Sequence, residues 1–124
     1  MKAVLIASES PTRSRLVDVI SELSDVHVEI QEPNETEVDL MIARLHPEVV
    51  LIDIDQSHGR GLQIIRQLHG QRGEKAPVIM AIASSTSLQY RTSCMEAGAM
   101  YFFNRVREQD WLLDSLASIQ EQLG

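Results

Sequence analysis

Hydrophobic residues in this chain form short unbroken runs that are separated by stretches with helical spacing. The unbroken runs are Ala3 to Ala7, Val49 to Ile52, Val78 to Ala83 and Tyr101 to Phe103. A run without polar alternation is typical of a strand that is buried on both faces, as in a parallel sheet with helices on each side. Val26 to Ile30 instead alternates with polar residues, which predicts a half-exposed edge strand.

Each predicted strand is followed by a stretch whose apolar residues recur every three or four positions, as on one face of a helix. These stretches run over Leu16 to Leu23, Val38 to Leu45, Leu62 to Leu68, Leu88 to Ala97 and Trp111 to Leu123. Pro11 lies near the first turn of the first helix, where its missing N–H costs nothing. Asn34 can cap the second helix, which is expected to end before Pro47. The apolar face of the last helix is expected to contain Trp111, Leu112, Leu116, Ile119 and Leu123.

Five strands that alternate with five helices predict an α/β fold in one domain, residues 1–124. Right-handed crossovers give an open parallel sheet with helices on both sides, a three-layer sandwich. The edge position of the second strand matches the flavodoxin-like strand order 2-1-3-4-5. In that order the switch point, where ligands of such sheets bind, lies between the first and third strands.

Acidic residues follow the two strands that flank this switch point. Glu9 comes after the first run, and Asp53 ends the third strand. A convergent carboxylate pair suits a hard cation such as Mg²⁺, with the backbone carbonyl of Asp55 as a further ligand. An Asp can also accept a phosphoryl group. The alternative is that Glu9 and Asp53 cap helix starts or bind backbone amides, but their joint position at the switch point favours a functional site.

Composition excludes several other classes of protein. A net charge of −7 argues against direct nucleic-acid binding. The lone cysteine, Cys94, rules out an internal disulfide, and the sequence contains no zinc-ligand cluster. No stretch reaches transmembrane length, so a cytoplasmic location without membrane contact is expected.

Four motifs carry a resemblance to a known family: VLIASESP, PEVVLIDID, APVIMAIAS and EAGAMYFFNR. With them the chain resembles, from end to end, the receiver domain of bacterial two-component response regulators. The resemblance implies that Asp53 is the phosphoacceptor. It further implies that Glu9, Asp53 and the Asp55 carbonyl hold Mg²⁺, and that Phe102 occupies the aromatic switch position. Gly61 matches the family's glycine at the start of the third helix.

The chain departs from the family pattern at Ser8, Ser57, Ile82, Arg105 and Val106. Ser8 replaces the first acid of the pair, so Mg²⁺ binding is expected to be weak. Ile82 or Ala83 stands where the family has a switch Thr or Ser, and Ser84 is the alternative source of a hydroxyl. Arg105 replaces the family's Lys and can pair with Asp53 or with a phosphate. Prolines are usual at the positions of Ser57 and Val106. The resemblance is therefore to a receiver that is degenerate in its active site.

The resemblance implies a signalling module, with at most self-phosphorylation and autodephosphorylation at Asp53 as enzymatic activity. A histidine kinase or phosphotransfer protein would supply the phosphoryl group. The face of the fourth helix, fifth strand and fifth helix would then contact a downstream protein, a fused output domain or a second copy. One alternative is a pseudo-receiver that docks proteins without phosphorylation, favoured by Ser8, Ile82 and Arg105. Another is a small flavodoxin-like hydrolase or flavin binder, opposed by the lack of a phosphate-cradling loop and an aromatic content of 4%.

Overall fold

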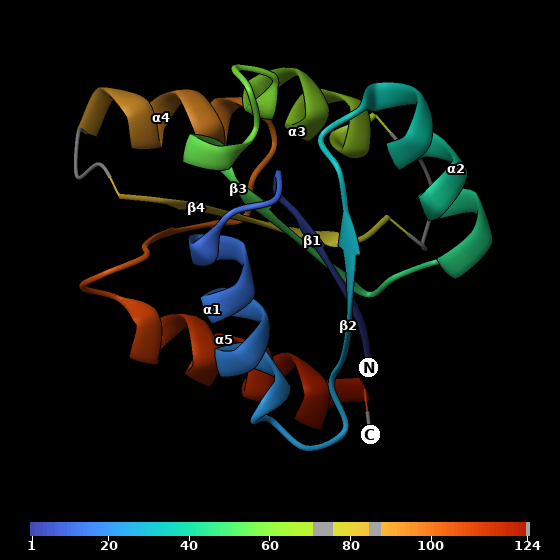
Figure 1. Ribbon diagram of the computed structural model, residues 1–124, viewed down its shortest axis with the longest axis vertical. Helices are drawn as coiled ribbons and strands as arrows, with labels where there is room; N and C mark the ends of the chain where they lie inside the picture. Colours follow the sequence, from blue (N-terminus) through green and yellow to red (C-terminus); the bar gives the residue numbers. More distant parts are fainter. Residues whose placement is uncertain (71–75, 85–87, 124) are drawn as a thin grey trace.

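The computed structural model describes residues 1–70, 76–84 and 88–123 of the chain. Five strands form one parallel sheet of order β2-β1-β3-β4-β5, which confirms the predicted flavodoxin-like topology (Figure 1). The strands are β1 (Lys2–Ile6), β2 (His27–Gln31), β3 (Val49–Asp53), β4 (Val78–Ala83) and β5 (Tyr101–Asn104). The helices are α1 (Pro11–Ser21), α2 (Glu35–Leu45), α3 (Gly61–His69), α4 (Leu88–Ala97) and α5 (Gln109–Leu123), with a short 3₁₀ helix η1 (Ile54–Gln56) after β3. In the sequence, a polar segment, residues 84–87, precedes the fourth helix, and a segment with two glycines, residues 70–73, follows the third; both lie partly outside the described residues.

The sheet separates two hydrophobic cores, and α1 and α5 cover one face while α2, α3 and α4 cover the other (Figure 1). Successive strand residues point to opposite faces, so each buried strand contributes to both cores. In β3, for example, Val50 and Ile52 pack beneath α2 to α4, whereas Val49 and Leu51 pack beneath α1 and α5. This two-sided burial explains why the sequence of β3 shows no polar alternation.

The predicted helix boundaries follow from local capping. The Asn34 side chain accepts a hydrogen bond from the N–H of Glu37 (2.9 Å), which caps α2 as predicted. At the other end His46 adopts a left-handed conformation and Pro47 follows, so α2 ends where the sequence indicated. In α1 it is Ser10 that accepts from the N–H of Arg13 (3.1 Å).

Part of the predicted apolar face of α5 is wrong. Leu112 and Leu116 are buried, but the side chains of Trp111 and Leu123 are 64% and 55% exposed. Trp111 precedes Leu112 by one residue, a rotation of about 100° around the helix axis that turns it away from the sheet. The same geometry leaves Met95 exposed beside the buried Cys94 in α4. Within the described ranges, no helix has both the length and the apolar character needed to cross a membrane.

Candidate functional site

Asp53 is the last residue of β3 and is fully buried at the carboxyl edge of the sheet. Its Oδ1 accepts a hydrogen bond from the N–H of Asp55 (3.1 Å) and thereby caps η1. The structural role considered for this carboxylate, binding of a backbone amide, is therefore present. The cap engages Oδ1, and Oδ2 lies 3.4 Å from Nη1 of Arg105.

The protonation equilibrium of Asp53 reflects its burial. Desolvation raises the pKa of this carboxyl above the ordinary value of 3.8, and the neighbouring Asp55 charge adds to the rise. The Arg105 guanidinium and the backbone N–H groups of Gln56 and Asp55 oppose the rise but do not cancel it. The molecule thus keeps an acidic group with a raised pKa in its interior, a pattern that is common at functional sites.

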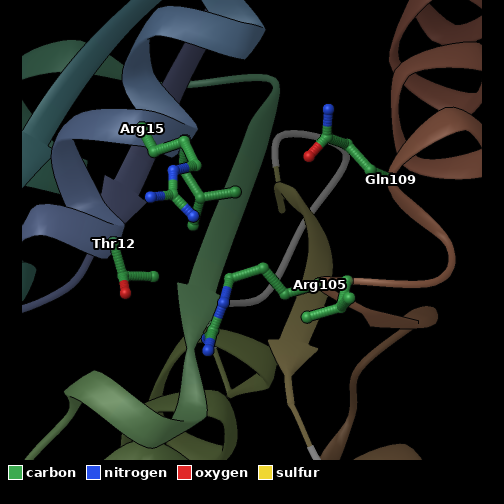
Figure 2. A pocket seen from close by; sticks show the side chains of 6 residues that line it. Thr12, Arg15, Arg105 and Gln109 are labelled. Atoms are coloured by element: carbon green, nitrogen blue, oxygen red, sulfur yellow. The ribbon is translucent and has the colours of Figure 1, made fainter.

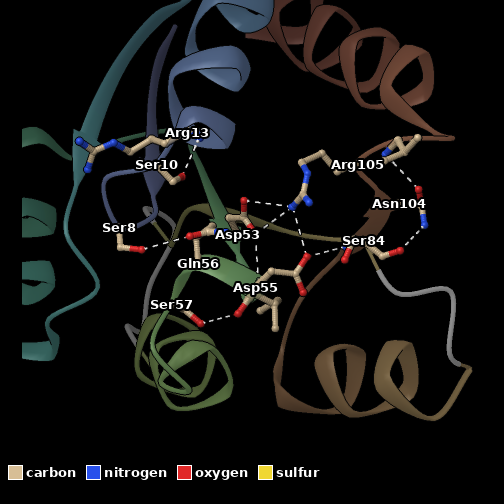
Figure 3. Close-up of polar contacts among 12 residues, drawn as sticks. Ser8, Ser10, Arg13, Asp53, Asp55, Gln56, Ser57, Ser84, Asn104 and Arg105 are labelled. Atoms are coloured by element: carbon tan, nitrogen blue, oxygen red, sulfur yellow. Dashed lines mark hydrogen bonds and ion pairs between the residues drawn. The ribbon is translucent and has the colours of Figure 1, made fainter.

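Arg105 supplies the positive charge nearest to this carboxylate. It follows β5, and its backbone N–H donates to the Ala83 carbonyl (2.8 Å). Its Nη1 lies 3.4 Å from each carboxylate oxygen of Asp53 and 3.2 Å from Oδ2 of Asp55 (Figure 3). The contact between Arg105 and Asp53 that the sequence allowed is therefore made in the unmodified chain.

Asp55 and Ser84 meet at the same edge, through a contact that the sequence did not indicate. The backbone N–H of Ser84 donates to Oδ2 of Asp55 at 2.7 Å. On the other side, the buried Asn104 donates from Nδ2 to the Ser84 carbonyl at 3.0 Å. Ser84 is thus held at its backbone groups, while its side chain belongs to an exposed residue.

The switch candidate Phe102 and the departure Ile82 are both buried hydrophobic residues. Ile82 pairs directly with Asp53 across β3 and β4, so an aliphatic chain lies at the register position next to the carboxylate. Phe102 packs in the core beneath α3 and α4, with its ring 6.3 Å from that of Tyr90 in a T-shaped arrangement. Arg91 lies over the Phe102 ring at 6.0 Å.

The end of β1 is close to the same site but is bonded more loosely. The N–H of Ser8 donates to the Gln56 carbonyl (2.8 Å), and its Oγ lies 3.4 Å from Oε1 of Gln56. These contacts place Ser8 beside the loop that carries Asp55. Glu9 is exposed.

The residues at this edge fit Mg²⁺ by donor type, although weakly. Mg²⁺ prefers oxygen ligands and needs one or two carboxylates, with water completing its shell. Asp53 offers a buried carboxylate, and Ser8 has a hydroxyl where an acid would add charge. Over the described ranges there is no group of three or more His, Cys, Asp or Glu side chains that could hold a metal ion. Any cation must also compete with Arg105 for Asp53.

The loop after Asp53 explains why Ser57 and Gly61 occur together. The buried Ser57 hydroxyl donates to the Ile54 carbonyl (2.7 Å) and closes the turn. A Cβ on Gly61 would lie 2.8 Å from Cδ1 of Ile54 and 2.9 Å from Oγ of Ser57. Gly61 is therefore required by close approach, and Ser57 supplies a turn-closing bond at a position where proline was expected.

A cavity of about 190 Å³ lies next to Arg105, between the start of α1 and the start of α5 (Figure 2). Its lining residues are Thr12, Arg15, Leu16, Arg105, Val106 and Gln109. Val106 is exposed, and its N–H donates to Oδ1 of Asn104 (3.0 Å). The cavity connects the surface of α1 with the cation that contacts Asp53.

Two polar residues of the site make contacts that were not predicted from the sequence. Asn104 accepts from the N–H groups of Val106 and Arg107, while its own N–H donates to Glu108 Oε1 (2.8 Å). Asn side chains commonly close turns by accepting from a backbone N–H two residues on, so the residue type could have indicated this role. Gln56 has no comparable signal, because its contact with Ser8 joins residues that are distant in sequence.

Comparisons with known proteins agree with this architecture. The family model described as "Response regulator receiver domain" matches residues 4–117. The BeF3-activated N-terminal receiver domain of Klebsiella pneumoniae RstA is 25% identical, with a TM-score of 0.77 over 94% of this chain and 96% of that one. The signal receiver domain of a DNA-binding response regulator (merR) from Colwellia psychrerythraea 34H has a TM-score of 0.84 at 14% identity, over 98% of both chains. The response regulator domain of Thermotoga maritima CheB has a TM-score of 0.75 at 16% identity, over 98% of this chain and 94% of that one.

No curated protein matches the sequence. The family match is nevertheless sufficient, because it covers most of the chain. Receiver domains are signalling modules of two-component systems and not metabolic enzymes; they generally bind Mg²⁺ and generally have a histidine kinase as partner. With residues 4–117 matched out of 124, the chain belongs to the response regulator receiver domain family.

Proposed function

We propose that this receiver accepts a phosphoryl group on Asp53 from a histidine kinase or phosphotransfer protein. The observation that carries the proposal is the placement of Asp53: a fully buried carboxylate at the end of β3, in contact with the cation that follows β5. A buried charge costs free energy, so its retention at the switch point of the sheet favours a functional role.

In the proposed step, the Oδ2 or Oδ1 of ionised Asp53 attacks the phosphorus of a phosphohistidine. A P–O bond forms and the P–N bond breaks, and the released imidazole takes a proton from solvent. Arg105 is placed to balance charge on the reacting oxygens, since its Nη1 is 3.4 Å from both. Mg²⁺, held by Asp53, Glu9 and the Asp55 carbonyl, would supply further charge neutralisation when bound.

The partners follow from the same proposal. The cavity beside Arg105 offers a recess on the α1 side into which a residue of the phosphodonor protein can fit. The face made by α4, β5 and α5 would bind a downstream protein, a fused output domain or a second copy. Exposed hydrophobic residues on these helices are Leu88 and Met95 of α4 and Trp111 of α5. The chain would act in the cytoplasm, where histidine kinases place their phosphohistidine.

Intact-mass measurement after incubation with a small phosphodonor and Mg²⁺ tests the phosphoacceptor directly. We expect a gain of one phosphoryl group in the wild type and none in Asp53→Asn. The matched control is Asp18→Asn, which removes an exposed carboxylate from α1 and should keep the gain. A gain that survives in Asp53→Asn would assign the chemistry to another residue, with Asp55 the first suspect.

A second candidate function is protein docking without phosphorylation. The observation that favours it is the existing contact of Arg105 with Asp53 and Asp55. Arg105 thus already lies beside Asp53 without a phosphoryl group to attract it. Ile82 adds to this case, because an aliphatic side chain cannot hydrogen-bond to a phosphoryl oxygen.

Hydrogen exchange with and without beryllofluoride, a mimic of the acyl phosphate, separates the two functions. Under the docking function, the amides between β4 and Arg105 respond little to the mimic. Strong new protection over this segment would restore an ordinary phospho-switch.

A further inference from the structure

The carboxylate of Asp55 joins two connections of the fold that are distant in sequence. Its Oδ2 accepts from the backbone N–H of Ser84, which follows β4, at 2.7 Å. The same oxygen lies 3.2 Å from Nη1 of Arg105, which follows β5. One anionic oxygen therefore holds both connections at the carboxyl edge of the sheet (Figure 3).

Asn104 completes a closed set of contacts around this oxygen. Its Nδ2 donates to the Ser84 carbonyl, and its Oδ1 accepts from the N–H groups of Val106 and Arg107. Asn104 is 4% exposed, and these bonds are partly buried. Ser84 is held by Asp55 on its N–H and by Asn104 on its carbonyl, and the turn that carries Arg105 is held by Asn104.

Asp53 is in a poorer position to do the same. Its two distances to Arg105 are both 3.4 Å, longer than the distance from Arg105 to Asp55. The described contacts of Asp53 include no bond to Ser84. Ile82, its neighbour on β4, offers no donor from its side chain. The anion that reaches the connection after β4 in the unmodified chain is therefore Asp55.

We propose that the Asp55 side chain is a built-in acceptor that draws Ser84, directly after β4, and Arg105, directly after β5, together without a phosphoryl group. In this role Asp55 is a positioning residue, because it acts on Ser84 and Arg105. The proposal concerns the unmodified protein and does not depend on phosphorylation of Asp53. It goes beyond the role of Asp55 as a backbone ligand of a cation.

The strength of these contacts decides whether Asp55 matters. Isolated surface ion pairs contribute little to stability. Asp55, however, also accepts a short bond from a backbone N–H, and charge-assisted bonds of this kind are about twice as strong as neutral ones. The Asp55 side chain is 27% exposed and that of Arg105 is 20% exposed, so both are partly shielded from solvent.

Amide hydrogen exchange of the unmodified protein, followed by NMR in metal-free buffer, tests the proposal. We expect the Ser84 amide to exchange about tenfold faster in Asp55→Ala than in the wild type, the effect of losing a bond to a charged acceptor. Asp114→Ala, which removes an exposed carboxylate from α5, should leave the Ser84 rate unchanged. The Leu51 amide in the centre of β3 reports on global stability and should not change in any variant that folds.

A more conservative variant covers the case in which Asp55→Ala does not fold. Asp55→Asn keeps an oxygen acceptor but loses the charge, and we expect a smaller acceleration of Ser84 exchange in the same direction. An unchanged Ser84 rate in a folded Asp55→Ala or Asp55→Asn protein would overturn the proposal.

The response of the Ser84 amide to beryllofluoride separates this role from a purely structural one. If Asp55 already binds Ser84 and Arg105, removing its carboxylate leaves both residues free to bind an anion on Asp53. We expect beryllofluoride to protect the Ser84 amide more in Asp55→Asn than in the wild type. An equal response in the two proteins would contradict the role of Asp55. If neither protein binds the mimic, the result counts against the proposed phosphorylation of Asp53. The exchange rates in metal-free buffer still test the role of Asp55 independently.

Discussion

The ends of β3 and β1 lie next to each other at one edge of the sheet, but the polar side chains at the two ends are hydrogen-bonded to different degrees. At the end of β3, Asp53 and Ser57 are fully buried and each makes hydrogen bonds within the loop. At the end of β1, Ser8 is also buried but makes one firm backbone bond and a long side-chain contact, and Glu9 is exposed. The β3 end of the site is thus pre-built, whereas the β1 end is held more loosely.

The difference between the two ends reflects which charged groups have a partner of opposite charge. A buried anion needs a permanent partner, and Arg105 provides one for Asp53. With Ser8 in place of an acid, the β1 side contributes less negative charge, so we expect a metal ion to be held less strongly there. The positive charge that the structure places beside Asp53 is the Arg105 guanidinium.

Removing the Arg105 guanidinium should have the largest effect, because the well-bonded β3 end depends on it. In metal-free buffer, Arg105→Ala leaves Asp53 buried without its cation, and we expect the free energy of unfolding to fall by about 2 kcal/mol. Denaturant unfolding measures this loss, with Arg107→Ala as an exposed control. Mg²⁺ should bind more tightly to the variant and recover part of the stability. A variant as stable as the wild type would show that Asp53 does not depend on Arg105.

Adding a negative charge at the end of β1 should strengthen Mg²⁺ binding at the less firmly bonded end of the site. We expect Ser8→Asp to tighten Mg²⁺ binding about tenfold, since a third carboxylate joins the shell. Titration of Mg²⁺ by calorimetry measures the change. Ser14→Asp places the same charge on an exposed position of α1 and should have little effect. If Ser8→Asp binds no better than the wild type, Ser8 lies outside the cation shell.

Deleting one hydroxyl at each strand end compares the two loops directly. Ser57→Ala removes the buried bond to the Ile54 carbonyl and should cost about 1 kcal/mol of unfolding free energy. Ser8→Ala removes a contact of 3.4 Å and should cost clearly less. Equal losses in urea unfolding would mean that the two loops are held equally well.

The pH dependence of stability should give the smallest effect. The pKa of Asp53 is raised by burial, so the folded state binds its proton more tightly than the unfolded state. The stabilisation from this group is present below the unfolded pKa and is lost as pH rises through the folded pKa. Asp53→Asn should therefore be more stable than the wild type at neutral pH in metal-free buffer. Thermal melts should show this gap closing as pH falls toward the ordinary aspartate value, and a gap that widens on acidification would contradict the sign.

The layered fold could be predicted from the sequence because its signals are local. Unbroken apolar runs identify strands buried on both faces, and Asn34 and Pro47 mark the ends of α2. The assignment of single side chains was less complete. Trp111 fits an apolar list but faces solvent, since membership of a helical face depends on the angle at which the helix lies against the sheet.

The candidate site was also only partly predictable from the sequence. Its position at the ends of β1 and β3 follows from the strand order, which hydrophobic patterning and right-handed crossovers predict. The partners of its charged groups were decided by tertiary structure. Asp55 meets Ser84 across 29 positions of sequence and Arg105 across 50, and no local pattern encodes such distances. Hydrophobic periodicity is a property of neighbouring residues, whereas a hydrogen bond between two loops exists only after the sheet has brought their strands together.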